Sequence, residues 1–397
     1  LRSYSARGYY IPLSLEKVTI TGGSSIGNNA FNGVRSVSTL EIPYFLMDIG
    51  TSAFSNMTGL TSFEIPSMLK EIPNSAFANT SSLGEVVIPK NIETIGSHAF
   101  SGSGLTSITF EEESQLKSIG FVAFSNTKNV TTVDFPATLE SIGNEAFRDA
   151  TALESINFSQ EANLISIGIS AFENASSLIS VTIPHSVESI GLQVFKNATS
   201  LEAINVAEDN PHYVSIDGVL YSKDYSSIIK YPEGKKGSSY SILSSTNHIV
   251  DNAFYNASKL TSIHIPDNME TIGLSAFENA SSITTLFIPK SVTSIKPSSF
   301  YNMTNLESID VDSSNDYYIS VDGILYTKTM DTLIKYPETK SKSSFMIPNT
   351  VSIIEYQAFT STKHLLHIIF EDNDQMTSIE HEHFSKASSL KTIEIPR

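Results

Sequence analysis

The sequence repeats itself with a period near 23 residues, and this repeat constrains the fold more than any other feature. A phenylalanine marks each copy, at Phe31, Phe54, Phe77, Phe100, Phe124, Phe147, Phe172, Phe195, Phe254, Phe277, Phe300, Phe359 and Phe384. Neighbouring marks lie 23 to 25 residues apart, except for two spacings of 59. A unit this short cannot bury its own apolar face, so the period predicts a solenoid whose coils stack around one continuous core.

One copy, residues 178–200, shows what each part of a coil is expected to do. Val181 and Ile183 alternate with polar residues, which predicts a short strand with both side chains inward. Pro184 should end that strand, because proline cannot donate to a ladder of hydrogen bonds. A second apolar pair predicts a brief extended segment on the opposite wall. The following Ile-Gly-x-x-Ala-Phe-x-Asn pattern predicts a short helical or 3₁₀ turn, closed by Asn197 in the left-handed conformation.

Stacking such coils predicts a strand-rich, right-handed solenoid with a parallel β-sheet on one face. A length of 397 residues with 40% apolar content would otherwise favour several globular domains. Because the repeat spans nearly the whole chain, we expect one domain over residues 1–397, with residues 1–14 as an N-terminal cap. The chain starts without Met and ends inside a repeat, so we expect a piece of a longer exported protein.

Each spacing of 59 contains an insertion of 36 residues beyond the regular 23, and the two insertions are copies of each other. Residues 210–221 match residues 315–326 at an offset of 105. Asp217-Gly218 and Asp322-Gly323 are turn signals between apolar runs. We therefore expect a β-hairpin or three-stranded excursion at residues 207–241 and another at residues 312–346, each projecting from the solenoid.

Composition excludes several classes of partner and site. The 42 acidic and 25 basic residues give a net charge of −17, which argues against nucleic acid and anionic membrane surfaces. The chain has no cysteine, so it has neither disulfides nor thiolate metal ligands. No apolar run is long enough to insert into a membrane. We expect an exported monomer.

The sequence contains few residues that could form a catalytic or metal site. The histidines of His364-Leu-Leu-His367 and His381-Glu-His383 are the densest group, but zinc needs three or four converging ligands. The register puts His367 on an open face and His383 beside Phe384, so we expect no metal site. No nucleophile motif or phosphate-binding loop is present. We therefore expect no catalytic residue, no cofactor and no enzymatic activity.

Two sets of surface residues are candidates for binding. His264, Phe287 and Asp310 occupy the same outward strand position in consecutive coils, and an outward aromatic in a polar sheet marks a possible contact site. The second set consists of the tyrosines of the insertions, which offer aromatic contact area: Tyr213, Tyr221, Tyr231, Tyr318, Tyr326 and Tyr336. Tyr221 and Tyr231 have an alternative role, which is to pack the insertion against the solenoid.

The combination of Leu-x-x-Ile-x-Ile-Pro, Val-x-x-Ile-Gly and Ala-Phe-x-Asn, repeated every 23 residues, resembles the BspA-like leucine-rich repeat family over residues 15–397. The resemblance implies a leucine-rich repeat solenoid in a secreted or surface-attached protein, often bacterial, that binds host or microbial surface macromolecules. It supplies no catalytic residue. Many members have cysteine three residues after the phenylalanine, where this chain has Ala or Met, as at Met57 and Ala175; that difference concerns packing.

Three functions are compatible with these features. The first is a non-enzymatic extracellular or cell-surface module for protein binding or adhesion, which contacts a host or microbial protein or glycan through the sheet face and the hairpins. The second is a structural stalk that displays another domain. The third is a glycan-binding protein, for which a cleft with paired carboxylates would be typical; the sequence shows no such pair.

Overall fold

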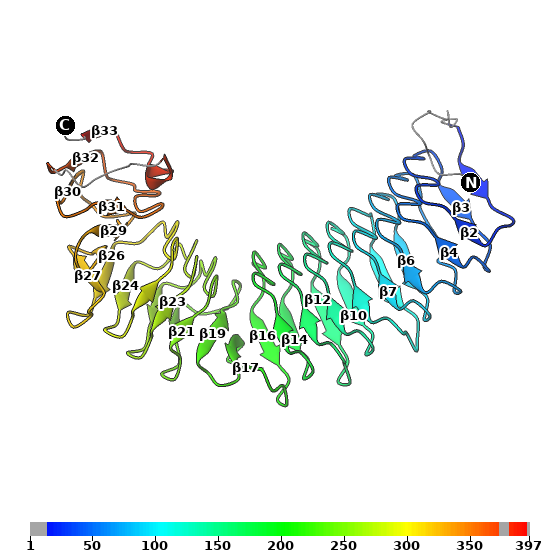
Figure 1. Cartoon of the computed structure of the whole chain (residues 1–397), viewed down its shortest axis with the longest axis horizontal. Coiled ribbons are helices and arrows are strands. Elements are labelled where there is room, and N and C mark those ends of the chain that lie inside the picture. The colour runs from blue at the N-terminus through cyan, green and yellow to red at the C-terminus, as the bar shows by residue number, and fades with distance from the viewer. Residues whose placement is uncertain (1–13, 373–380, 395–397) are drawn as a thin grey trace. The chain divides into compact units, whose positions relative to one another are not determined.

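The computed structural model describes residues 14–372 and 381–394 of the chain (Figure 1). The chain forms two compact units, residues 1–212 and residues 213–397, and each is described here by itself. A single domain over residues 1–397 stays a prediction, and most of the predicted cap at residues 1–14 lies outside the described residues.

The first wall of each unit is built from parallel strands that pair one repeat apart, as the alternating pattern predicts. Val133 pairs with Ile156 and Val181 with Ile204, and all four side chains are buried. In the first unit these strands are β1 (Lys17–Thr19), β3 (Thr39–Glu41), β6 (Glu85–Ile88), β8 (Ser107–Phe110), β10 (Thr132–Phe135), β12 (Ser155–Phe158), β14 (Ser180–Ile183) and β16 (Ala203–Val206). In the second unit they are β20 (Ser239–Ser241), β22 (Ser262–His264), β24 (Thr285–Ile288), β26 (Ser308–Val311), β30 (Ser344–Ile347), β32 (His367–Phe370) and β33 (Thr392–Glu394).

The second wall consists mostly of two-residue strands, each with one inward isoleucine or leucine. Ile95 pairs with Ile119, for example, and both are buried. In the first unit the strands are β2 (Ser25–Ile26), β4 (Asp48–Ile49), β5 (Glu71–Ile72), β7 (Thr94–Ile95), β9 (Ser118–Ile119), β11 (Ser141–Ile142), β13 (Ser166–Ile167) and β15 (Ser189–Ile190). In the second unit they are β19 (Ser227–Lys230), β21 (His248–Ile249), β23 (Thr271–Ile272), β25 (Ser294–Ile295), β29 (Thr332–Lys335) and β31 (Ile353–Ile354).

The third wall corrects the prediction of a short helical turn in each coil. In the coil around Phe54, the amides of Ala53 and Ser55 close turns onto carbonyls three residues earlier. The amides of Phe54 and Asn56 instead donate to the next coil. Ser52, inside this segment, has a φ of 56°, which a right-handed helix cannot contain. Among the described residues, η1 (His381–Phe384) is the one helical element.

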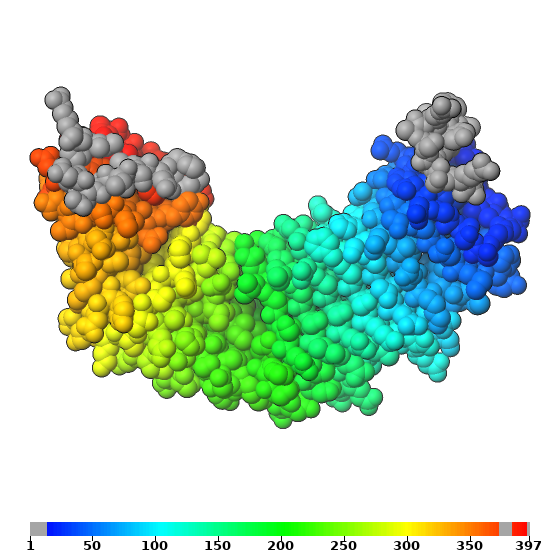
Figure 2. All heavy atoms as spheres, in the orientation of Figure 1, coloured from blue at the N-terminus to red at the C-terminus, as the bar shows by residue number. Residues whose placement is uncertain are grey.

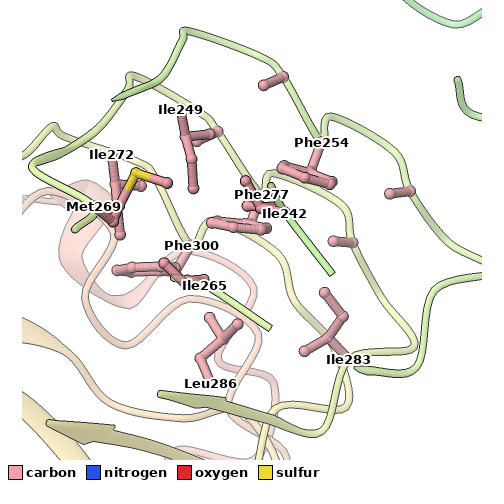
Figure 3. Packing of buried hydrophobic residues seen from close by; sticks show 14 of the residues in the cluster. Ile242, Ile249, Phe254, Ile265, Met269, Ile272, Phe277, Ile283, Leu286 and Phe300 are labelled. Carbon is pink, nitrogen blue, oxygen red and sulfur yellow. The ribbon is translucent and has the colours of Figure 1, made fainter. Parts of the chain in front are cut away.

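The marker phenylalanines form the centre of the core. Phe77 and Phe100 stack with ring centroids 5.2 Å apart, and Phe100 stacks on Phe124 at the same distance. Figure 3 shows the corresponding stack in the second unit, where Phe277 lies against Phe300 among inward isoleucines. In Figure 2 the colours of residues 14–212 follow one another in narrow bands, as expected of coils that pack on their neighbours in sequence.

Asparagines close the coils, as the sequence predicts. The Nδ2 of Asn197 donates to the Oδ1 of Asn174 over 2.8 Å, and Asn302 makes the same bond to Asn279 over 2.7 Å. The members of this set share a positive φ: Asn56, Asn79, Asn174, Asn197, Asn256, Asn279 and Asn302. We call this column the asparagine ladder.

The insertions contain hairpins, but they do not simply project from the solenoid. In the first, β17 (Tyr213–Ile216) and β18 (Val219–Ser222) form a hairpin, and β18 then pairs antiparallel with β19. In the second, β27 (Tyr318–Val321) and β28 (Ile324–Thr327) do the same with β29. Strands β19 and β29 also pair in parallel with β21 and β31. Each hairpin therefore extends the sheet of the second wall.

Each insertion also contains one complete coil, which the sequence analysis missed. Tyr231 lies 23 residues before Phe254, its amide donates to the carbonyl of Ala253, and its ring stacks on Phe254 at 5.3 Å. Tyr336 stacks on Phe359 at the same distance. Tyrosine thus replaces the marker phenylalanine, and a spacing of 59 is a 36-residue unit followed by a regular 23-residue unit. The predicted hairpin ranges, 207–241 and 312–346, are too wide because they include this coil.

Candidate functional site

The outward residues predicted from the sequence lie together on the first wall of the second unit. Phe287 on β24 pairs with Asp310 on β26, and His264 lies on β22, the strand on the other side of β24. All three residues are exposed, and Phe287 is 49% accessible. The predicted neighbourhood of Phe287 and Asp310 is confirmed, and a binding role for the three residues stays a prediction.

Small hydroxyl residues surround this aromatic ring. The second outward position of the same strands is occupied by Ser262, Thr285 and Ser308. A phenylalanine that stands above short polar side chains offers a partner an apolar anchor, and the flanking His264 and Asp310 offer hydrogen bonds.

The second hairpin lies directly beside this face. The amide of Ile309 donates to the carbonyl of Gly323 at the hairpin turn over 2.9 Å. A Cβ on Gly323 would come within 2.8 Å of the Cβ of Ser308, so only glycine fits this approach. Both Asp322 and Gly323 have positive φ, as the turn signal predicts.

Opposite charges meet at this hairpin turn. Lys342 and Lys340 lie 2.6 and 3.3 Å from the carboxylate of Asp322. The hydrogen bond from Lys342 contributes most to holding the pKa of Asp322 below its ordinary value. We use the name sheet–hairpin surface for His264, Phe287, Asp310, Asp322 and Lys342.

Most of the tyrosines predicted to form a contact surface lie in the interior instead. Five of them are buried: Tyr221, Tyr231, Tyr318, Tyr326 and Tyr336. Tyr213 is half-buried. The physical reason is that Tyr231 and Tyr336 occupy the marker position of the core, while Tyr221 bonds Tyr240 through their hydroxyls at 2.5 Å. Burial raises the pKa of Tyr221. This placement agrees with the alternative role, in which tyrosines pack the insertion against the solenoid.

Two buried ion pairs accompany these tyrosines and were missed by the sequence analysis. Lys230 lies 3.1 Å from Glu233, and Lys335 lies 2.7 Å from Glu338. In each pair the lysine replaces the alanine that normally precedes the marker residue, and the glutamate takes the place of the ladder asparagine. The signal was the Lys-Tyr-Pro-Glu sequence, which occurs once in each insertion.

The two ion pairs differ in how their carboxylates are satisfied. The Nδ2 of Asn256 donates to Glu233 over 2.8 Å. The equivalent of Asn256 in the second insertion is Ser361, which donates to Asn302 instead. Within residues 14–372 and 381–394, the Oε2 of Glu338 has no hydrogen-bond partner. Burial raises the pKa of Glu338 to about 7.

The histidines considered as metal ligands do not form a cluster in the described part of the chain. The Nδ1 of His367 lies 2.8 Å from the hydroxyl of Thr392, and His383 is buried. The side chain of His381 lies outside the described part of the chain. In that part, no three His, Asp or Glu side chains converge as a metal site would require.

None of the described helical segments has the length and apolar character needed to cross a membrane.

Two strand walls, a turn wall and a buried phenylalanine column define a leucine-rich repeat solenoid. The family model described as BspA type leucine rich repeat region (6 copies) matches residues 5–120, 110–216, 233–333 and 335–397. The chain therefore belongs to this family, as the sequence motifs predict. No curated protein matches the sequence.

Several solved bacterial structures share the fold. The pneumococcal vaccine antigen PcpA is 23% identical, with a TM-score of 0.63 over 85% of this chain and 89% of that one. A leucine rich cell surface protein from Faecalibacterium prausnitzii is 20% identical, with a TM-score of 0.56 over 91% and 88%. A leucine-rich repeat protein from Eubacterium ventriosum is 22% identical, with a TM-score of 0.52 over 85% and 73%. At these identities the likeness concerns the fold.

Proposed function

We propose that this protein is a non-enzymatic binding module on the outside of a bacterial cell, and that it holds a protein partner through the sheet–hairpin surface. The observation that carries the proposal is the half-exposed Phe287, which stands between His264 and Asp310 on a sheet of small hydroxyl residues. A central aromatic anchor with a polar rim is the arrangement that protein interfaces favour.

The family supports the location outside the cell. Among the structures with this fold, one is described as a cell surface protein and another as a vaccine antigen. The net charge of −17 favours an exposed, soluble surface over binding to nucleic acid or to an anionic membrane. We propose that the module is secreted or surface-attached and acts as a monomer.

The test is a substitution at the anchor with a matched control elsewhere in the chain. Phe287→Thr gives this position the residue found at the same register in β8, and Val87→Thr makes an equivalent change on β6 of the first unit. Wild-type protein is screened against immobilised extracellular-matrix proteins and glycans. We expect a protein ligand whose Kd rises at least tenfold with Phe287→Thr, about 1.4 kcal/mol, and is unchanged with Val87→Thr.

Other results would favour the alternatives. A flat response across the screen would overturn the proposal in favour of a stalk that displays another domain. Binding to glycans alone would favour a glycan-binding protein. Equal loss of binding with both substitutions would show that the sheet–hairpin surface is not the binding site.

A further inference from the structure

The second unit contains a cavity of about 150 Å³ on its second wall. Two turns form its sides, one at Pro297 and Ser298 and the other at Tyr356 and Gln357. Tyr318 from the hairpin also lines the cavity. We call this cavity the short-coil pocket.

The pocket exists because one coil is two residues shorter than its neighbours. In an ordinary coil the marker residue follows the inward residue of the second wall by five positions, as Phe300 follows Ile295 and Phe359 follows Ile354. In the coil between them, Tyr336 follows Leu333 by only three positions. The short coil therefore lacks the turn that projects from the coils on both sides of it.

Contacts across the short coil agree with this explanation. Leu333 pairs with Ile354 on the second wall, and the Tyr336 amide donates to the next coil, so both ends of the short coil keep the regular register. The hydroxyl of Ser298 nevertheless reaches the Oε1 of Gln357, 59 residues away, over 3.3 Å. The two flanking coils thus meet above a gap in the coil between them.

The pocket offers hydrogen-bond donors and acceptors with balanced charge. The hydroxyl of Tyr318, a residue that is 9% exposed, accepts the Ile295 amide over 2.8 Å and makes no other hydrogen bond among the described residues. Its hydrogen is therefore available to a ligand. Lys296 and Glu355 line opposite sides, and Lys335 at the base is paired with Glu338 over 2.7 Å.

These features select the class of ligand. A volume of 150 Å³ corresponds to about five water molecules at about 30 Å³ each, which is below the roughly 300–1,000 Å³ typical of pockets for larger ligands. Glu355 would repel a free anion and Lys296 would repel a free cation. An apolar ligand would leave the hydrogen of the Tyr318 hydroxyl without an acceptor. A neutral ring rich in hydroxyl groups satisfies these groups, and its apolar face can pack on the exposed ring of Tyr356.

We propose that the short-coil pocket binds one uncharged sugar residue, either as a free monosaccharide or as the terminal residue of a glycan. The pocket is separate from the sheet–hairpin surface, so this inference does not rest on the proposed protein partner.

The experiment uses saturation-transfer NMR of the whole chain with glucose, galactose, mannose and N-acetylglucosamine at millimolar concentration, and with sialic acid as the anionic comparison. A glycan array bearing the same residues at its termini is probed in parallel. Tyr356→Ala removes the exposed ring, and Leu274→Ala is the matched control, since Leu274 is the exposed residue at the equivalent turn position. Tyr318→Phe removes only the hydroxyl.

We expect a neutral sugar to bind wild type and Leu274→Ala alike, and its Kd to rise at least tenfold in Tyr356→Ala and in Tyr318→Phe. Binding on the array without binding of the free sugar would assign the ligand to a glycan terminus. The proposal is overturned if no neutral sugar binds in either format, if sialic acid alone binds, or if Tyr356→Ala binds as well as the control. Circular dichroism confirms that each variant is folded.

Discussion

At the scale of single residues, the repeat makes the inward phenylalanines predictable, but not the inward tyrosines that replace two of them. Every marker phenylalanine up to Phe359 is buried, as its spacing indicates. The tyrosines of the insertions are candidates for a contact surface because they offer the aromatic area that interfaces favour, and the structure places most of them in the interior. The 23-residue distances from Tyr231 to Phe254 and from Tyr336 to Phe359 were the signal that both belong to the core.

Replacing a marker residue should create a cavity between two coils. Phe277 is fully buried and stacks on Phe254 and Phe300, at centroid distances of 5.1 and 6.1 Å. We expect Phe277→Ala to lower the free energy of unfolding by about 3–5 kcal/mol, because the neighbouring rings can relax only in part. Urea denaturation measures the change, with the exposed Leu274→Ala as control. An unchanged midpoint would contradict the central role of the phenylalanine stack.

The buried Glu338 should make stability depend on pH in a direction unusual for a carboxylate. Burial raises its folded pKa from 4.5 to about 7, so the folded protein binds this proton more tightly than the unfolded chain does. The stability contributed by the protonated form is complete below pH 4.5 and is lost as the pH rises from 4.5 to 7. The slope approaches about 1.4 kcal/mol per pH unit.

Glu338→Gln should remove this dependence while keeping the shape of the side chain. The measurement is the difference in free energy of unfolding between wild type and variant at pH 5 and at pH 8, with Glu233→Gln at the equivalent position as control. We expect the Glu338→Gln variant to gain stability relative to wild type as the pH rises. A difference that stays constant over this range would show that the carboxyl titrates normally.

At the scale of elements, the strands were predictable from local sequence and the turn wall was not. Alternating apolar residues place the strands of the first wall, and the proline after many of them marks the end. The Ile-Gly-x-x-Ala-Phe segment has the apolar spacing of a helical turn. Every second amide donates to a carbonyl of the next coil instead of to one in its own coil. The sequence of one coil does not reveal this choice of acceptor, because the acceptor belongs to another coil.

The asparagine ladder combines a backbone requirement with a side-chain bond, and two substitutions separate them. Asn174 has a φ of 63°, donates to Asp149 over 2.6 Å and accepts from Asn197 over 2.8 Å. Asn174→Ala should cost about 0.5–1.5 kcal/mol for each hydrogen bond, and more because alanine lacks the polar side chain that lets asparagine tolerate the left-handed region. Asn174→Gly loses the bonds without that strain, so denaturation should find it the more stable variant. The opposite order would assign the role of Asn174 to something other than conformation.

At the scale of the whole molecule, membership of the family and the coil architecture follow from periodicity, because every coil repeats the same packing problem. The pairing of Phe287 with Asp310 also follows, since a register is set by the period. The short-coil pocket does not, because it depends on two turns 59 residues apart that approach each other over a coil lacking the same turn. The place of the hairpin against Ser308 likewise depends on tertiary packing.

The 36-residue unit has an evolutionary meaning as well. Its last strand pairs in parallel with the ordinary coil that follows, β19 with β21 in one copy and β29 with β31 in the other, so each copy joins the following coils in their regular register. The two copies keep the Asp-Gly turn and the Lys-Tyr-Pro-Glu sequence, yet Tyr240 corresponds to Phe345 and Asn256 to Ser361. The exchange of Asn256 for Ser361 removes the side chain that donates to Glu233 in the first copy, and the Oε2 of its equivalent Glu338 has no hydrogen-bond partner among the described residues. The exchange of Tyr240 for Phe345 removes the hydroxyl that bonds Tyr221, the equivalent of Tyr326. The two copies thus share their turn and their ion pair and differ at positions that satisfy buried groups, which is the pattern expected after duplication of one segment.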